Sequence, residues 1–256
     1  GMCPLHFDMA TMELYAAPLV GACVVVMGDA LMRLFLAEFT ERCEHERVTV
    51  WYTVPYFLRQ LGERGVLDRR DLGRLRLVMY GGEPYPVEAL RELMCAIPHA
   101  DFWNVYGPAE VNGCVNHLVR EPLTEGSAPP IGRPWGAAEI RIVDSSGADV
   151  PDGVAGELLV SATTAMREYW RRPDLTAERL TPRPDGAPWY ATGDLVERDA
   201  DGVLWFRGRR DNQVKVRGVR LELEAIESIL TDAPGVAHAV ACTVGPSGDA
   251  TSIAAA

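Results

Sequence analysis

The sequence predicts an α/β protein whose α/β layers are followed by a small antiparallel β-barrel and by the start of an α+β C-terminal subdomain. Helix-like stretches alternate with short apolar strands over residues 1–125, which is typical of a layered sheet with parallel pairings. Over residues 126–210, short strands are separated by Gly and Asp turns, as in a small antiparallel barrel or sheet. Residues 211–256 then give a strand, a helix and a second strand. We therefore expect three structural units with these boundaries.

The first unit begins with an apolar run over residues 9–20 that suits a buried helix, with Asp8 as its N-cap. Clusters of apolar, β-branched and aromatic residues predict strands, and amphipathic spacing between them predicts helices. The expected strands are residues 23–27, 48–54, 75–80 and 101–105, and the expected helices are residues 31–45, 55–65 and 87–96.

The second and third units have shorter elements. In the second unit we expect strands at residues 139–143, 156–160 and 203–206, and a helix at residues 174–180. In the third unit we expect a strand at residues 213–216, a helix at 222–230, a turn at 232–235 and a strand at 236–244. This order is the start of a βαβ arrangement, and we expect the unit to be incomplete at residue 256.

Composition excludes some classes of partner. The chain has 256 residues, 48% of them apolar and 24% charged, with a formal net charge of −11. An acidic protein of this kind is a poor candidate for general binding to nucleic acid or to an anionic membrane. The apolar run at residues 14–27 is too short to span a bilayer and contains Pro18. A local cluster of cations at residues 205–220 still suits one anionic nucleotide.

The cysteines do not predict a metal site. The 6 cysteines are scattered, no CxxC pair occurs, and the histidines are equally dispersed. A structural zinc site is therefore not expected. We expect reduced thiols and a cytoplasmic location.

Several segments carry the functional signal. Residues 208–220 (Gly-Arg-Arg-Asp-Asn-Gln-Val-Lys-Val-Arg-Gly-Val-Arg) combine cations with glycines, and residues 190–195 read Tyr-Ala-Thr-Gly-Asp-Leu. Residues 104–110 read Asn-Val-Tyr-Gly-Pro-Ala-Glu, and Gly-Glu-Leu-Leu-Val at 156–160 precedes Tyr-Trp-Arg-Arg-Pro-Asp-Leu-Thr-Ala-Glu-Arg at 169–179. In this order and at this spacing, nearly the whole chain resembles the amino-acid adenylation domains of nonribosomal peptide synthetases, members of the adenylate-forming enzymes.

The resemblance implies a fold and an activity. The fold is a large part of α/β layers with a distorted barrel, then a hinge and a small mobile subdomain. The activity is activation of an amino acid by ATP and Mg²⁺ to aminoacyl-AMP, followed by transfer to the phosphopantetheine thiol of a carrier-protein domain. A small helper protein is a further candidate partner. The family's phosphate loop (TSGSTGxPKG) and its C-terminal catalytic lysine do not occur in these residues, so we expect a fragment that adenylates weakly or not at all.

The resemblance also implies roles in nucleotide chemistry. Glu110 would bind Mg²⁺ and act in catalysis together with Lys215, and Asp211 would be the hinge. The nucleotide would be bound by residues near the adenine, the ribose and the phosphates, namely Tyr106, Gly82, Asp194 and Arg209. Each role has a plainer alternative. The segment from Tyr106 to Glu110 would be an ordinary Gly-Pro turn, Asp194 would lie in an ordinary Gly-Asp turn, and the cations around Arg209 would form a solvated charged face.

Asp8 is the residue that the resemblance assigns to the substrate α-ammonium. A primary ammonium that leaves water needs a carboxylate partner, although Asp8 would also serve as a plain helix cap. The expected pocket wall is apolar or aromatic and consists of Met9, Met12, Tyr52, Val78, Tyr80, Val105, Gly113 and Cys114. With no charge opposite Asp8, this wall predicts a small or cyclic hydrophobic amino acid such as proline. The alternative is that several of these residues only fill the core.

Two other functions remain open. An aryl- or acyl-CoA ligase would share the fold but activate an acid without an amine, so that Asp8→Ala would leave its activity largely intact. A non-catalytic, adenylation-like interaction module would give no heat on titration with ATP and magnesium.

Overall fold

The first sheet carries the parallel strands that the sequence predicts. The computed structural model describes residues 2–5, 7–120, 128–184, 186–217, 219–233, 236, 238–245 and 252–255. Three parallel strands lie side by side in it, β1 (Val50–Thr53), β2 (Leu77–Gly81) and β3 (Asp101–Tyr106). Two strands that were not predicted, β4 (Val115–Val119) and β5 (Arg133–Pro134), extend this sheet with antiparallel pairings.

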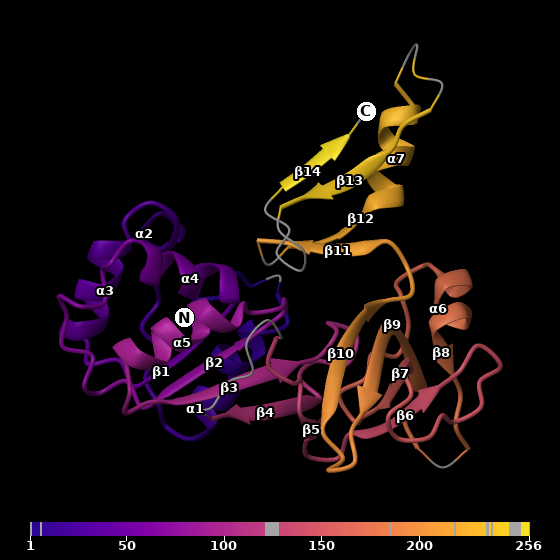
Figure 1. Cartoon of the computed structure of the whole chain (residues 1–256), viewed down its shortest axis with the longest axis horizontal. Helices are drawn as coiled ribbons and strands as arrows, with labels where there is room; N and C mark the ends of the chain where they lie inside the picture. The colour runs from indigo at the N-terminus through magenta and orange to yellow at the C-terminus, as the bar shows by residue number, and fades with distance from the viewer. Residues whose placement is uncertain are drawn as a thin grey trace.

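Helices cover one face of this sheet (Figure 1). They are α3 (Leu36–His45), α4 (Pro55–Glu63) and α5 (Val87–Ala96). Their apolar stripes and the facing strand residues form one hydrophobic core, whose most buried members include Phe39, Trp51, Leu58, Leu61, Val78, Tyr80, Leu90, Leu93 and Phe102. Each such side chain contributes roughly 1.5–3 kcal/mol on burial, so this packing fixes the strand ends that carry the site.

The first fifty residues differ from expectation in three places. The helix predicted at residues 31–45 is split into α2 (Asp29–Arg33) and α3, because Phe35 has φ −122° and ψ 60°, outside the helical region. Residues 23–27 do not form a strand, because no strand of the described chain forms a ladder with them. The run at residues 9–20 is helical, with a π-helical turn η1 (Met12–Ala16) and α1 (Ala17–Leu19). Only its first two residues, Met9 and Ala10, are buried, and Leu19 is 87% exposed.

The second part is an antiparallel sheet, the lower right of Figure 1. Its strand order is β10-β9-β7-β6, and β8 pairs with β9. The strands and the one helix are β6 (Glu139–Val143), β7 (Gly156–Ser161), α6 (Pro173–Arg179), β8 (Leu180–Thr181), β9 (Trp189–Arg198) and β10 (Leu204–Arg209). The long strand β9 was not predicted. A second core holds this sheet together, with Leu158, Val160, Tyr190, Val196 and Leu204 among its buried members.

The two sheets are joined where β5 approaches β10. Gly132 pairs with Leu204 in an antiparallel bridge, and the Ile131 amide donates to the Leu204 carbonyl at 2.9 Å. The start of β10 therefore lies beside the segment that leads into β5. The expected unit boundary at residues 125 and 126 lies outside the described residues.

The third part consists of two antiparallel pairs and a helix. They are β11 (Gln213–Val216) with β12 (Val219–Glu222), α7 (Leu223–Thr231), and β13 (Ala241–Val244) with β14 (Ser252–Ala255). The expected βαβ arrangement is wrong for the described residues, because β11 turns back at Arg217 (φ 52°) and pairs with β12 rather than with β13. The expected strand at 236–244 begins only at Ala241, and two residues of the expected turn, 234 and 235, lie outside the described residues.

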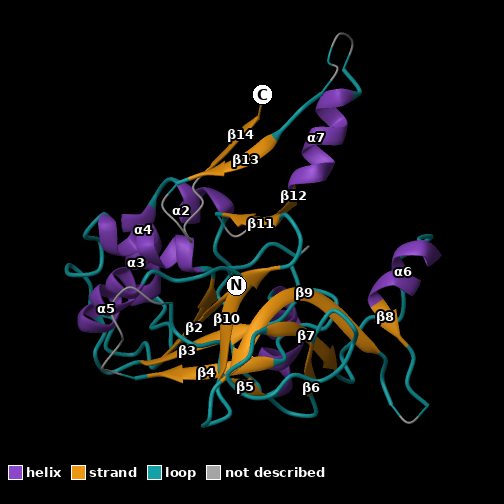
Figure 2. Cartoon of the chain, turned by 45° about the vertical axis from the view of Figure 1, so that its right-hand side comes forward, coloured by secondary structure: helices purple, strands orange, loops and turns teal. Residues whose placement is uncertain are grey.

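Figures 1 and 2 show the third part above the junction of the two sheets. In Figure 2, α6 and β8 project to the right of the second sheet, on the side away from the first sheet. The predicted fold class, α/β layers followed by an antiparallel β unit and an α+β part, is confirmed. Within the described residues, none of the helices combines the length and the apolar character needed to cross a membrane.

Candidate functional site

The centre of the site is an ion pair between two adjacent strands. Asp194 on β9 and Arg209 on β10 are opposite each other in the antiparallel ladder. Arg209 Nη1 lies 2.5 Å from Asp194 Oδ1, and both side chains are largely buried. Arg209 also forms a two-point contact with Asp211, with Nε–Oδ1 at 2.6 Å and Nη2–Oδ2 at 2.8 Å. This fork geometry fixes the plane of the guanidinium.

Local backbone chemistry explains why Asp194 points here. Gly193 has φ 73°, and a Cβ at this position would lie 2.8 Å from Arg209 Nη2 and from Asp211 Oδ2. Thr192 Oγ1 donates to the Leu158 carbonyl at 2.8 Å and accepts from the Asp194 amide at 3.0 Å. The Thr-Gly-Asp sequence therefore ties the carboxylate to the neighbouring strand and leaves room for the arginine.

Tyr106, at the carboxyl end of β3, reaches the same carboxylate from the first sheet. Its hydroxyl donates to Asp194 Oδ2. Burial raises the pKa of Tyr106, and the Asp194 charge raises it further, so the phenol stays protonated. The next residue, Gly107, has no room for a side chain, because a Cβ there would meet the Asn112 carbonyl. Each Asp194 oxygen still has a free lone-pair direction, so the carboxylate is able to accept additional hydroxyl donors.

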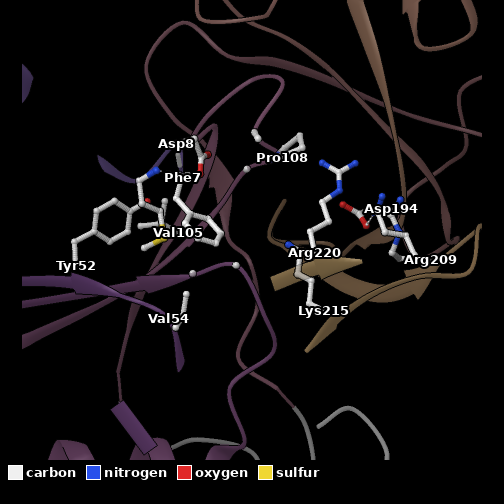
Figure 3. Close-up of a pocket in the computed structure, with 17 residues that line it drawn as sticks. Phe7, Asp8, Tyr52, Val54, Val105, Pro108, Asp194, Arg209, Lys215 and Arg220 are labelled. Carbon is white, nitrogen blue, oxygen red and sulfur yellow. Dashed lines mark hydrogen bonds and ion pairs between the residues drawn. The ribbon is translucent and has the colours of Figure 1, made fainter. Parts of the chain in front are cut away.

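Two cavities meet at this cluster. The first, of about 100 Å³, is lined by Asp8, Tyr52 and Val105 at one end and by Asp194 and Arg209 at the other. Figure 3 shows these two groups of side chains facing a common space. The second, of about 450 Å³, shares several of its lining residues with the first and extends over others, among them Asn104, Tyr106, Phe206 and Thr243. A space of this size is typical of a small-molecule site.

Asp8 lies at the apolar end of the first cavity. Its Oδ1 accepts the Met9 amide at 2.9 Å, which is the amide of the next residue and not of the second or third helical residue that an N-cap serves. Burial raises the pKa of Asp8, although the hydrogen bond from Met9 and the charge of Lys215 oppose this. A carboxylate in this position gains from a cationic partner.

The structure corrects part of the expected pocket wall. Met9, Tyr52, Val105 and Gly113 line the first cavity, together with residues that sequence reasoning missed, among them Phe7, Val54 and Gly81. Met12 and Cys114 are not among the residues that line either cavity, and Cys114 is buried in the second core.

Val78 and Tyr80 were also expected in the wall, but both are fully buried in the first core. The strand registers pair Val78 with Trp51 and Met79 with Tyr52. Because side chains alternate between the faces of a strand, a shift of one residue exchanges the faces. Met79 is therefore on the face of Tyr52 and Val105, and the expected pair lies on the helix-covered face.

Glu110 follows the Gly-Pro turn after β3 and has two partners from distant segments. Arg220 Nη1 lies 2.7 Å from Glu110 Oε2, and the Tyr169 hydroxyl donates to Glu110 Oε1 at 2.8 Å. Burial by itself raises the pKa of Glu110, but the charge and hydrogen bond of Arg220 outweigh it, so the pKa lies below its ordinary value. Neither Arg220 nor Tyr169 was assigned a role from the sequence, although both lie within the quoted segments.

Lys215 on β11 lines both cavities, as do Gly82 and Arg209. Burial lowers the pKa of Lys215, while the Asp194 charge opposes that shift. Asp211 lies between β10 and β11, where the second part passes into the third. The pKa of Asp211 lies below its ordinary value, because the charge and hydrogen bond of Arg209 outweigh the effect of burial, which alone would raise it. The expected nucleotide residues Gly82, Tyr106, Asp194 and Arg209 all line the larger cavity.

A magnesium ion fits this site only with help from a ligand. The described residues contain no group of three or more His, Cys, Asp or Glu side chains placed to hold a metal. Magnesium is commonly bound through one or two carboxylates together with substrate phosphates. Glu110 is such a single carboxylate, so the donor set suits a magnesium ion that arrives with a polyphosphate.

This chain is similar in sequence to known enzymes. A family model described as "AMP-binding enzyme" matches residues 1–170. An L-proline–[L-prolyl-carrier protein] ligase of Streptomyces coelicolor is 38% identical over 242 residues, which are 93% of this chain and 44% of that protein. Phenyloxazoline synthase MbtB of Mycobacterium tuberculosis is 38% identical over 250 residues, which are 95% of this chain and 17% of that protein. The chain therefore spans less than half the length of these relatives.

Solved structures agree with the fold. The crystal structure of IdnL1 superposes with a TM-score of 0.86 at 33% identity and covers 94% of this chain and 50% of that one. The Vibrio cholerae adenylation domain AlmE, solved in complex with glycyl-adenosine-5'-phosphate, superposes with a TM-score of 0.85 at 28% identity and covers 98% of this chain and 48% of that one. The resemblance to amino-acid adenylation domains is thereby confirmed. Since the family model matches more than half of its residues, the chain belongs to the AMP-binding enzyme family.

Proposed function

We propose that this chain is part of a ligase that activates an amino acid with ATP, as aminoacyl-AMP, and transfers it to the phosphopantetheine thiol of a carrier-protein domain. One observation carries the proposal: Asp8, Asp194 and Arg209 line a single cavity. A carboxylate for an ammonium and a carboxylate–guanidinium pair for a sugar and phosphate are the groups that an aminoacyl-adenylate requires at its two ends. The relatives named for prolyl-carrier ligation support the same chemistry.

Each end of the cavity has a role in this proposal. Asp194 accepts the ribose hydroxyls, Arg209 contacts ribose or phosphate oxygens, and Tyr106 and Gly82 border the adenine. Glu110 holds magnesium, which when bound would neutralise phosphate charge during attack by the carboxylate. The protein's own contribution is positioning and electrostatics. Lys215 serves from the C-terminal part, which turns about Asp211 between the two reactions.

The proposed substrate is a small or cyclic hydrophobic amino acid, with proline as the first candidate. Around Asp8 the first cavity is lined by apolar and aromatic residues, among them Phe7, Tyr52, Val54 and Val105. A charged substrate side chain would have no partner among them, and burying an unpaired charge is costly. Two ligases for L-proline, 38% and 34% identical to this chain, support this choice.

Calorimetry with a non-hydrolysable prolyl-adenylate analogue tests the proposal on this chain. Asp194→Asn removes the charge that Arg209 and the ribose share, and charged hydrogen bonds contribute about 1.5–3 kcal/mol. We therefore expect at least about a tenfold loss of affinity. Asp152→Asn is the matched control, because this exposed carboxylate pairs with Arg198 on the far turn, with Arg198 Nε 2.5 Å from Asp152 Oδ1. Absence of binding by the unmodified chain, or equal affinity in both variants, would refute the proposal.

A further inference from the structure

The Glu110 carboxylate connects three segments that lie far apart in the sequence. Its Oε1 accepts the Tyr169 hydroxyl at 2.8 Å, and its Oε2 accepts from Arg220 Nη1 at 2.7 Å. Tyr169 precedes α6 in the second part, whereas Arg220 lies on β12 in the third. The Glu110 side chain is only 11% exposed, so water does not replace these partners. The carboxylate depends on a cationic neighbour for its charge.

The two partners differ in how they are attached to the molecule. Tyr169 belongs to the same part as β7 and β9, and its hydroxyl also lies 3.4 Å from the Tyr190 hydroxyl on β9. Arg220 belongs to the β11–β12 hairpin, which follows Asp211. The rotation about Asp211 in the proposed function would carry Arg220 away from Glu110 and leave Tyr169 in place. The carboxylate then has its Oε2 free and its charge uncompensated.

We infer that Tyr169 and Arg220 are positioning residues for Glu110, and that docking of the β11–β12 hairpin and binding of a divalent cation with ATP exclude each other. The inference rests on the proposed function, in which Glu110 holds that cation. Tyr169 fixes Oε1 in both states, so the carboxylate keeps its orientation. Arg220 occupies Oε2 in the docked state, and Glu110 would hold the cation in the undocked state.

Electrostatics makes the exclusion strong. A guanidinium and a divalent cation on one carboxylate oxygen repel each other at short range in a site with little water. This coupling is reciprocal. If docking of the hairpin lowers the affinity for the cation by some factor, binding of the cation lowers the docking equilibrium of the hairpin by the same factor. Glu110 would therefore exchange Arg220 for the cation when ATP binds, and Arg220 would return to Glu110 once the cation had left.

The hairpin has other contacts, so removal of Arg220 need not unfold it. The Arg217 guanidinium lies over the Tyr56 ring of α4, 5.8 Å from its centroid. Gln213, at the start of the hairpin, has its amide 3.3 Å from Asp211 Oδ1. Arg207 offers a matched control: it is an arginine outside the hairpin, on β10, whose Nε lies 2.9 Å from Glu197 Oε2 within the second part.

Affinity for manganese with ATP, measured by electron paramagnetic resonance, is the first readout. Manganese is the paramagnetic probe in place of magnesium. We expect Arg220→Gln to bind it at least about fivefold more tightly than the unmodified chain, the lower end of ordinary coupling between sites. Arg220→Lys keeps the positive charge and should restore most of the original affinity, and Arg207→Gln should match the unmodified chain. Tyr169→Phe should bind several-fold more weakly, because Oε1 is no longer held.

The distance between the two parts is the second readout. Cys95 on α5 and Cys242 on β13 are exposed thiols that accept a pair of fluorescent dyes in a Cys23→Ser background. Addition of ATP with magnesium should lower the docked population of the unmodified chain. Arg220→Gln should have a low docked population with or without it, and Tyr169→Phe should resemble the unmodified chain before addition.

The outcomes separate this inference from the function on which it rests. Equal manganese–ATP affinity in the unmodified chain and in Arg220→Gln overturns the inference and leaves the proposed function standing. So does an unchanged dye distance under conditions where manganese–ATP is shown to bind. If no variant binds the nucleotide with its cation, the proposed function fails and the inference fails with it.

Discussion

Single carboxylates carry most of the proposed chemistry of this site, and each is influenced by its neighbours. Asp194 is neutralised by Arg209 and bonded by Tyr106, while Glu110 is neutralised by Arg220. Asp8 is different, because burial raises its pKa and the cations of the site lie at the other end of the cavity. An ionised Asp8 therefore destabilises the empty site and gains a partner when an ammonium binds.

The pH dependence of Asp8 follows from this direction of shift. Its folded-state pKa lies above 3.8, so the folded chain holds the proton more tightly and stability falls as pH rises through that pKa. Amine binding needs the ionised form, so affinity for the prolyl-adenylate analogue should fall as pH is lowered through the same range. Calorimetric titrations from about pH 4 to about pH 8 measure this, because the range spans the ordinary carboxyl pKa and values raised well above it.

Asp8→Asn should remove that pH dependence and weaken binding of the analogue at neutral pH by at least about thirtyfold, because loss of one partner of a buried charge pair costs about 2–5 kcal/mol. The free energy of unfolding at neutral pH should rise slightly, because a buried unpaired charge is gone. An analogue that lacks the amine is the control and should bind both forms alike. Equal loss for both analogues would show that Asp8 acts only as a structural residue.

At the scale of elements, the β9–β10 pair holds the site together. It aligns Asp194 with Arg209, and a register shift between Phe206 and Gly208 lets the end of β10 turn towards Asp211. Gly193 is the position where this arrangement is most crowded, because its left-handed backbone lies against Arg209 and Asp211. A side chain there has to displace the ion pair.

Gly193→Ala separates crowding from backbone strain. Gly147 has φ 83° and no atom within 4 Å of the point where a Cβ would lie, so Gly147→Ala is a control that carries only the left-handed penalty of roughly 1–2 kcal/mol. We expect Gly193→Ala to lower the free energy of unfolding by more than Gly147→Ala does, and to reduce affinity for the prolyl-adenylate analogue at least about tenfold. Urea denaturation and calorimetry measure the two effects. Similar values for both variants would mean that the ion pair adapts freely to a side chain.

Sequence patterns predicted the helices and strands whose apolar residues recur at regular spacing. They missed strands that form because a partner strand is available. The strands β1, β2 and β3 and the helices α4 and α5 follow apolar periodicity and lie where expected. Strand β9 contains the polar Thr-Gly-Asp segment and was interpreted only as a motif, because periodicity does not report a partner strand. Val78 and Tyr80, which were expected in the pocket wall, are buried in the first core. One residue of register decides which face of a strand a side chain occupies, and apolar patterns do not fix it.

The site residues that could be predicted were those inside recognisable motifs. Tyr106 and Arg209 come from different segments of the sequence, and both form hydrogen bonds with the Asp194 carboxylate. Their convergence was expected from the family's order of segments. Arg220 and Tyr169 were not assigned roles, because a contact such as Arg220–Glu110 depends on how the third part lies against the first.

For the whole molecule, the charge distribution matches the proposed chemistry. The chain has a net charge of −11, yet Arg209, Lys215 and Arg220 all line the cavity that holds Asp8 and Asp194. An acidic surface with a local cationic interior discourages non-specific polyanions and suits the one nucleotide of the proposed function. Two of these cations lie in the C-terminal part, so the position of that part sets the charge of the site.

The most direct test is a crystal structure of this chain with a non-hydrolysable prolyl-adenylate analogue. The account predicts that the amine lies within about 3.2 Å of an Asp8 oxygen and that the ribose hydroxyls lie at hydrogen-bonding distance from Asp194. An analogue bound with its amine away from Asp8, or with its ribose outside the cleft between β9, β10 and the end of β3, would contradict it.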